Sequence, residues 1–320
     1  MSTQQQKKEI LLEAGTNEME IIEFYLGTQP FGINVQKLKE IIPFDRQAVT
    51  SIPGCGEGML GTLLLRGSTI PLIDLKKHLT HKDTSEESSQ RRVVLVCEFN
   101  NRTNGFKVDG VNQIHRISWN DVQPMASFID QFHPRFTGSV NIDGRDILIV
   151  DLEHIVTEFD SEANMDYEVQ LHQDSMKEKL PHTREKMKLM MAEDSSLIRA
   201  GIEKVLRGAG YTSLEVFSDG QECHDRLVEI KQEVVNGAKL TDKLQLLITD
   251  IEMPKMDGLT LCKRVKNDSA LKDLKVILFS SLINEQMSYK CDMVGADGYA
   301  TKPQIPYLVE MIDKLLEIEK

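Results

Sequence analysis

The sequence has few of the features that mark secreted, membrane-spanning or disulfide-bonded proteins. Only 5 of its 320 residues are cysteine and none form a C-x-x-C pair, so neither a disulfide framework nor a zinc site is expected. No apolar run approaches the roughly 18 residues of a membrane helix. The first nine residues lack the apolar centre of a signal peptide. These absences predict a soluble, cytoplasmic protein with no membrane-inserted segment.

A basic region is missing as well. The net charge is −12, and each half of the chain contributes −6, because acidic residues outnumber basic ones by 22 to 16 in the first half and by 28 to 22 in the second. Proteins hold phosphate backbones with clusters of lysine and arginine. We therefore expect no nucleic-acid partner.

The composition is that of a globular protein, with 40% apolar and 28% charged residues. The length favours two domains of roughly 150 residues. A highly charged stretch, in which Pro181 would interrupt a helix, separates two parts with different patterns. We predict a first domain over residues 1–160, a linker over residues 161–185 and a second domain over residues 186–320.

The first part has the pattern of many short strands. Two-residue turns, Arg66–Gly67 and Asp143–Gly144, stand between apolar runs as hairpin candidates. Only brief helices are expected, around Val35–Ile41 and Asp151–Phe159. Short strands separated by glycine, asparagine and aspartate indicate an all-β barrel or sandwich.

The second part alternates apolar runs with segments of helical spacing. Such repeated βα units predict a parallel sheet with helices on both faces. Ligands of these sheets bind beyond the carboxyl ends of the strands. The polar residues that follow the apolar runs, and should therefore meet at this edge, are Glu193, Asp194, Asp250, Ser280, Ser281 and Lys302.

This set of side chains suits phosphoryl transfer to a carboxylate. Clustered carboxylates fit Mg²⁺, and without a cation they would repel one another. Lys302 and Ser280 could hold the remaining oxygens of a phosphoryl group. A lone aspartate after a strand most often caps a helix, and a lone lysine is usually solvated. We favour the site because four separate connections supply it.

Residues from about Met187 to Lys320 resemble the receiver domain of two-component signalling. The motifs that carry the resemblance are Glu193–Asp194, Thr249–Gly258, Phe279–Ser281 and Gly295–Pro303. The resemblance implies a flavodoxin-like (βα)5 fold with Asp250 as the phosphoacceptor. It also implies that Mg²⁺ is the cofactor, held by Glu193, Asp194, Asp250 and the backbone carbonyl of Glu252.

The same resemblance assigns three further roles. Ser280 and Lys302 would contact the phosphoryl oxygens, and Tyr299 would be an aromatic switch that swings inward when Ser280 moves. The acidic side chain of Glu252 departs from the plainest pattern of the family. We expect it to alter the lifetime of the phosphate.

Residues from Glu20 to about Phe159 resemble the chemotaxis coupling domain, the CheW-like fold of paired five-stranded barrels. The resemblance is carried by segments such as Phe31–Asn34, residues 61–67 and Ile147–Asp151. In that family, grooves near the Leu-Arg-Gly hairpin bind the receptor's cytoplasmic tip and the kinase's homologous regulatory domain. The resemblance implies that the interface residues are Gly61, Leu65, Arg66 and Gly67. The alternative for Arg66 is a solvated charge at a hairpin tip.

A coupling domain followed by a receiver is the arrangement of the CheV family. The resemblance implies a cytoplasmic adaptor, recruited to chemoreceptor arrays, that joins chemoreceptors to the histidine kinase CheA and is regulated by phosphorylation of Asp250. The receiver could also act as a phosphate sink. No catalysis on an external substrate is expected.

Two alternatives stay open. A Mg²⁺-dependent phosphohydrolase would use the same aspartyl chemistry, but it would need a lid or substrate pocket. A transcriptional regulator would need a basic domain that reads DNA.

Overall fold

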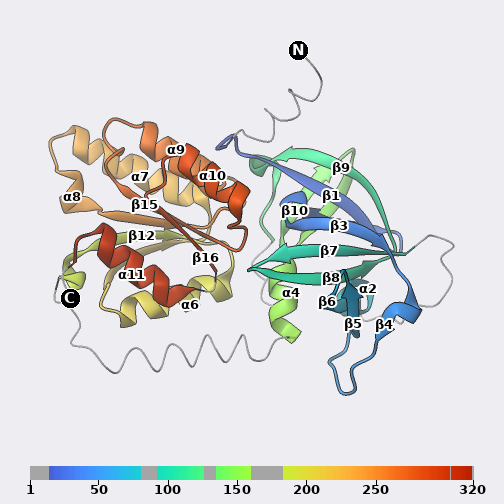
Figure 1. Cartoon of the computed structure of the whole chain (residues 1–320). Coiled ribbons are helices and arrows are strands. Elements are labelled where there is room, and N and C mark those ends of the chain that lie inside the picture. The colour runs from blue at the N-terminus through green and yellow to red at the C-terminus, as the bar shows by residue number, and fades with distance from the viewer. Residues whose placement is uncertain (1–13, 81–91, 126–134, 160–182, 303, 319–320) are drawn as a thin grey trace, which may run out of the picture. The chain divides into compact units, whose positions relative to one another are not determined.

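The computed structural model describes residues 14–80, 92–125, 135–159, 183–302 and 304–318 (Figure 1). The chain divides into two compact units. One, the coupling unit, is Met19–Ser161, and the other, the receiver unit, combines Glu162–Lys320 with the residues that precede Met19. Residues 14–18 thus group with the receiver unit, although the sequence pattern placed them in the first domain. Most of the linker expected at residues 161–185 lies outside the described residues.

The coupling unit contains two sheets. The first has the strand order β10-β11-β2-β1-β9 and the second the order β3-β7-β8-β6-β5-β4. The first sheet consists of β1 (Glu18–Leu26), β2 (Gln29–Asn34), β9 (Gly110–Ser118), β10 (Phe136–Ile142) and β11 (Arg145–Val150). The second consists of β3 (Leu38–Pro43), β4 (Val49–Thr50), β5 (Met59–Leu65), β6 (Ser68–Asp74), β7 (Val93–Phe99) and β8 (Arg102–Val108). The second sheet thus has six strands where five were expected, since the two-residue β4 pairs with β5.

The two hairpin turns are confirmed. Arg66 and Gly67, with φ of 50° and 88°, connect β5 to β6, and Asp143 and Gly144, with φ of 52° and 76°, connect β10 to β11. Two consecutive residues with positive φ are what a type I′ turn requires.

The helix expected over Val35–Ile41 is wrong. Only Val35–Lys37 forms a single 3₁₀ turn, and β3 follows it. The side chains of β3 alternate between half-buried and exposed, which is the period of a strand, and β3 pairs with β7. The helix expected near the end of the domain is confirmed as α4 (Leu152–Phe159), and a short helix α2 (Leu75–Thr80) was missed.

Both sheets of the coupling unit contribute to one core. Phe24 and Phe31 of the first sheet share a buried cluster with Leu95 and Phe106 of the second and with Leu152 of α4. Each such side chain stabilises the fold by about 1.5–3 kcal/mol when it is buried. A shared cluster of buried side chains therefore joins the two sheets of this unit.

The receiver unit has the predicted α/β fold, with five parallel strands in the order β13-β12-β14-β15-β16. The strands are β12 (Lys188–Ala192), β13 (Ser213–Phe217), β14 (Leu246–Thr249), β15 (Lys275–Ser280) and β16 (Gly298–Thr301). The helices are α6 (Ser196–Gly208), α7 (Gly220–Val235), α8 (Leu240–Lys243), α9 (Gly258–Asn267), α10 (Glu285–Met293) and α11 (Ile305–Leu315). This order is the flavodoxin-like one. The second strand, β13, lies on one side of the first strand, β12, and the later strands are added on its other side.

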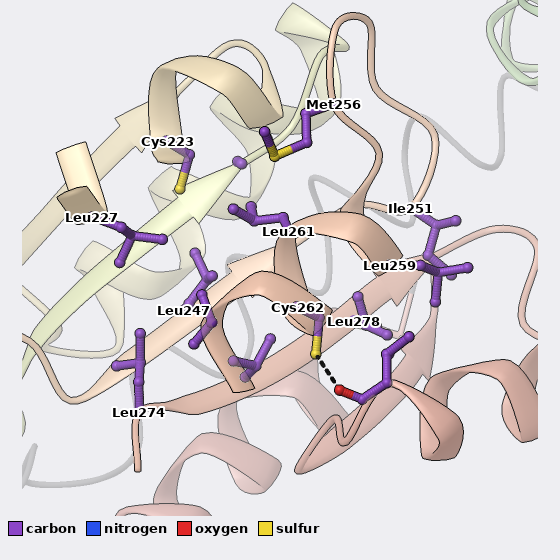
Figure 2. Close-up of a cluster of buried hydrophobic side chains, with 14 of the residues drawn as sticks. Cys223, Leu227, Leu247, Ile251, Met256, Leu259, Leu261, Cys262, Leu274 and Leu278 are labelled. Atoms are coloured by element: carbon purple, nitrogen blue, oxygen red, sulfur yellow. Dashed lines mark hydrogen bonds between the residues drawn. The ribbon is translucent and has the colours of Figure 1, made fainter. Parts of the chain in front are cut away.

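Helices cover both faces of this sheet. Successive residues of β12 face opposite sides, so Met190 joins the core under α7, α9 and α10, and Leu189 joins the core under α6 and α11. Figure 2 shows the first of these cores, with Leu227 of α7 and Leu261 of α9 directed toward Leu247 of β14. Packed on both faces, the sheet is a rigid support for the loops at its carboxyl edge.

Candidate functional site

Three acidic side chains meet at the carboxyl edge of the receiver sheet. Glu193 and Asp194 follow β12, and Asp250 follows the neighbouring strand β14. One carboxylate oxygen from each lies within 4.8 Å of the others. Glu193 is only 1% exposed and Asp250 only 6%. The structure therefore brings together the three carboxylates that the sequence assigned to this edge.

Lys302 lies between two of these carboxylates. Its Nζ is 2.8 Å from Asp250 Oδ2 and 2.8 Å from Glu193 Oε2, and its side chain is buried. It follows β16, the edge strand, so the ammonium group and the carboxylates come from three separate strand ends. The four ionised side chains together carry a formal charge of −2, which matches one divalent cation.

The backbone around Asp250 fixes the orientation of its carboxylate. The N–H of Ile251 donates to Asp250 Oδ1 at 2.6 Å, so Oδ1 faces the loop and Oδ2 faces Lys302. The loop then doubles back, because the N–H of Gly258 donates to the carbonyl of Ile251 at 3.0 Å. A Cβ at Gly258 would lie 1.8 Å from the Asp250 carbonyl oxygen, so only glycine fits there.

A residue that the sequence analysis missed holds the acidic pair. Arg199, in the first turn of α6, donates through Nη1 to the carbonyl oxygens of Glu193 at 2.6 Å and Asp194 at 2.9 Å. The N–H of Ser195 donates to Asp194 Oδ1 at 2.9 Å. An arginine one turn into the helix after the acidic pair was the available sequence cue.

The remaining receiver residues lie on β15, on β16 and in the loop after β14. Ser280 is the last residue of β15 and is buried, and its carbonyl accepts from the backbone N–H of Lys302 at 3.3 Å. Tyr299 on β16 is partly buried against the core that includes α10. The carboxylate of Glu252 does not belong to the group of three that could hold a metal ion among the described residues.

The donor set fits Mg²⁺. Mg²⁺ prefers hard oxygen ligands, typically one or two carboxylates completed by water and phosphate oxygens. Glu193, Asp194 and Asp250 supply such oxygens, and a buried ammonium beside them favours a further anionic group. The arrangement can therefore hold a divalent cation and a phosphoryl group next to Asp250.

The predicted interface residues of the coupling unit lie on and beside the β5–β6 hairpin. The Arg66 side chain is 78% exposed, and its Nη2 forms an ion pair with Glu40 Oε2 at 2.8 Å. Leu65 is half-buried and Gly67 is exposed. Gly61, by contrast, is buried, and a Cβ there would lie 2.1 Å from the Thr50 carbonyl oxygen, so its position is governed by the packing of β4 on β5.

A shallow apolar hollow of about 120 Å³ lies beside this hairpin. Leu64, which lines it, is 69% exposed, so part of the apolar lining is open to solvent. Apart from Leu65, none of its lining residues was predicted to be an interface residue. They are Ile42, Pro43, Phe44, Asp45, Ala48, Val49, Leu63, Leu64, Leu65, Leu72 and Val94.

Comparison with known proteins identifies both units. The CheW-like domain model matches residues 20–160, and the response regulator receiver domain model matches residues 189–313. Chemotaxis protein CheV3 of Helicobacter pylori is 30% identical over 315 residues, which cover 94% of this chain and 96% of that protein. The chain belongs to the CheV family of chemotaxis proteins.

Two other relatives agree with this assignment. CheV2 of Helicobacter pylori is 28% identical over 94% of this chain and 95% of its own length. CheW of Rhizobium meliloti is 31% identical over 45% of this chain and 91% of its own length, which is the extent of a single coupling domain. The family and fold inferred from sequence are confirmed: the CheV-family chain is a chemotaxis coupling adaptor with a phosphorylatable receiver domain.

None of the helices in the described part of the chain has the length and apolar character needed to traverse a bilayer.

Proposed function

We propose that this protein links chemoreceptors to the histidine kinase CheA, in the cytoplasm and within receptor arrays, and that phosphorylation of Asp250 adjusts the linkage. The observation that carries the proposal is the buried Asp250 carboxylate, with Oδ2 2.8 Å from Lys302 Nζ and two more carboxylates beside it. Such a group can accept a phosphoryl group, because the lysine and a cation would stabilise the charge that develops.

The chain's own residues have distinct parts in this proposal. Glu193, Asp194, Asp250 and the carbonyl of Glu252 would hold Mg²⁺, which neutralises phosphoryl charge when bound. The N–H of Ile251 orients the Asp250 carboxylate by binding Oδ1. Burial excludes bulk water, which strengthens each of these interactions. The Glu252 carboxylate, two residues past the acceptor, would alter the lifetime of the phosphate.

Ser280 and Tyr299 would convert the new charge into a change of shape. A phosphoryl group on Asp250 would attract the Ser280 hydroxyl, and Tyr299 would turn further into the core. The surface of α10, β16 and α11 would then change, where Tyr289 and Tyr307 are 53% and 51% exposed. A local charge that biases two packing states is a common signalling device.

The coupling unit would supply the binding surface. The hollow beside the β5–β6 hairpin, exposed Leu64 and exposed Arg66 combine an apolar contact with a charge at its rim. This pattern fits a protein partner, for which we propose the receptor's cytoplasmic tip or the homologous regulatory domain of CheA. The receiver could in addition act as a phosphate sink, which accepts phosphoryl groups from the kinase. Catalysis on an external substrate is not part of the proposal.

Transfer of radiolabel from phosphorylated CheA to the full chain tests the acceptor. We expect Mg²⁺-dependent label on the native protein that hydroxylamine removes, as it does from an acyl phosphate, and loss of this label in Asp250→Asn. Asp292→Asn, at an exposed position on α10, is the matched control and should be labelled like the native chain. Equal labelling of Asp250→Asn would refute the assignment. Steady turnover of a small phosphoester would instead favour a phosphohydrolase.

A further inference from the structure

The segment before β1 lies against the loop that carries the phosphoacceptor. Asn17 is only 7% exposed, and its side-chain amide spans two backbone groups of this loop. Nδ2 donates to the Lys255 carbonyl at 2.9 Å, and Oδ1 accepts from the Asp257 N–H at 2.9 Å. The φ of Asn17 is 59°, a left-handed conformation that asparagine tolerates better than most residues. One side chain thus satisfies a donor and an acceptor, as a neighbouring strand would.

Two further contacts hold the same segment. Ala14 is 6% exposed and belongs to the receiver core that includes Leu259 of α9. Its carbonyl accepts from Lys263 Nζ, also on α9, at 2.8 Å. Gly15 has a φ of 65°, and a Cβ there would lie 3.2 Å from the Leu259 carbonyl oxygen. Ala14–Asn17, which we call the clasp, therefore follows the surface of α9 closely.

The loop connects the clasp to the phosphoacceptor through short contacts. Asp257 caps α9 by accepting from the N–H of Thr260 at 2.8 Å and from its hydroxyl at 2.6 Å. The next residue, Gly258, packs directly on the backbone of Asp250, with no room for a side chain. A displacement of Asp257 would therefore shift the backbone of Asp250. On its other side, the clasp continues within one residue into β1, since β1 begins at Glu18.

We propose that the clasp holds the phosphoacceptor loop in the geometry that binds Mg²⁺, with Asn17 as a positioning residue, and passes the state of that loop to β1 of the coupling unit. The inference rests on the proposed Mg²⁺ and phosphoryl site. A loop that is already ordered loses less conformational freedom when an ion binds, so a closed clasp raises the affinity for Mg²⁺. By reciprocity, bound Mg²⁺ tightens the clasp by the same factor.

The test uses the full chain and two measurements: hydrogen exchange at the Asp257 amide without metal, and Mg²⁺ affinity by calorimetric titration. Asn17→Gly keeps the left-handed backbone accessible and removes the amide. We expect about tenfold faster exchange at Asp257 and about fivefold weaker Mg²⁺ binding. Asn101→Gly, at an exposed asparagine with a φ of 58° in the turn between β7 and β8, should change neither quantity. Lys263→Met, which loosens the clasp from the receiver side, should weaken Mg²⁺ binding by about twofold.

A third measurement follows the signal toward the coupling unit. In the native chain, Mg²⁺ should slow exchange at the Asp257 amide and at the first amides of β1, and in Asn17→Gly this effect should disappear. Unchanged Mg²⁺ affinity in Asn17→Gly, despite faster exchange at Asp257, would show that the clasp is only a tether and would overturn the inference while leaving the metal site intact. A native chain that protects Asp257 but binds no Mg²⁺ would overturn both the proposed site and the inference.

Discussion

The carboxylate of Glu23 and the three carboxylates of the receiver pocket have opposite surroundings. Glu23 of the coupling unit is fully buried and has four side-chain partners: Tyr25, Asn112, His115 and Arg145. The receiver pocket gathers three carboxylates around the shared ammonium of Lys302. A carboxylate with its hydrogen bonds complete stabilises one structure. A group with excess negative charge instead suits a cation, as the proposed function requires.

The pKa of Glu23 shows the effect of its hydrogen-bond partners. Burial alone would raise it, but hydrogen bonds from His115, Tyr25, Arg145 and Asn112 outweigh burial and lower the pKa to about 2. The folded coupling unit therefore depends on the ionised form of this residue.

Glu23→Gln should have the largest effect on stability. The substitution leaves Arg145 and His115 without their charged partner, and we expect the free energy of unfolding to fall by about 2 kcal/mol. Chemical denaturation followed by fluorescence of Trp119, in the coupling unit, measures the change. Glu20→Gln, at an exposed position of the same strand, is the control and should be neutral. If Glu23→Gln and the native chain have similar free energies of unfolding, Glu23 and its partners do not stabilise the coupling unit.

The stability of the coupling unit at acid pH should also depend on Glu23. The folded pKa of Glu23 lies below its ordinary value of 4.5, so its contribution is present above that value and is lost as the pH falls toward about 2. Between pH 5 and pH 2 the native coupling unit should therefore lose more stability than Glu23→Gln does. Denaturation midpoints measured across this range give the comparison, and parallel curves for the two proteins would contradict it.

In the receiver pocket, removal of a carboxylate should have the opposite sign. Asp194→Asn keeps an oxygen for the Ser195 N–H but removes one of three neighbouring negative charges. Without Mg²⁺ we expect the receiver unit to gain about 1 kcal/mol of stability. With Mg²⁺ the native chain should be stabilised by metal binding and the variant much less. Thermal unfolding with EDTA and with Mg²⁺ tests both parts, and a destabilised metal-free variant would show that the pocket resembles the Glu23 network after all.

The smallest effect is expected at Arg199, which binds backbone carbonyls of the acidic pair. Arg199→Ala should lower Mg²⁺ affinity by about threefold, because the loop after β12 becomes freer. Lys204→Ala, at an exposed position of the same helix, is the matched control. Calorimetric titration with Mg²⁺ gives the ratio. If the two variants bind alike, Arg199 has no positioning role.

Much of the receiver pocket could be predicted because its geometry follows from a local pattern. Asp250 and Lys302 each follow an apolar run, and the carboxyl ends of parallel strands meet at one edge. Residues 35–41 were misassigned, because apolar spacing in a short segment is compatible with both a helix and a strand. The pairing of β3 with β7 decided between them.

The sequence by itself determined the two kinds of domain, the strand-end carboxylates and the hairpin turns, because these depend on residue type and on spacing within a few positions. Only the tertiary structure decided the partners of Glu23, the contacts of Arg199 and the place of Asn17. Asn17 and Asp257 are 240 residues apart in sequence, and their hydrogen bond exists only because the folded chain brings them together. No local pattern encodes such a contact, since its energy depends on the burial of both ends.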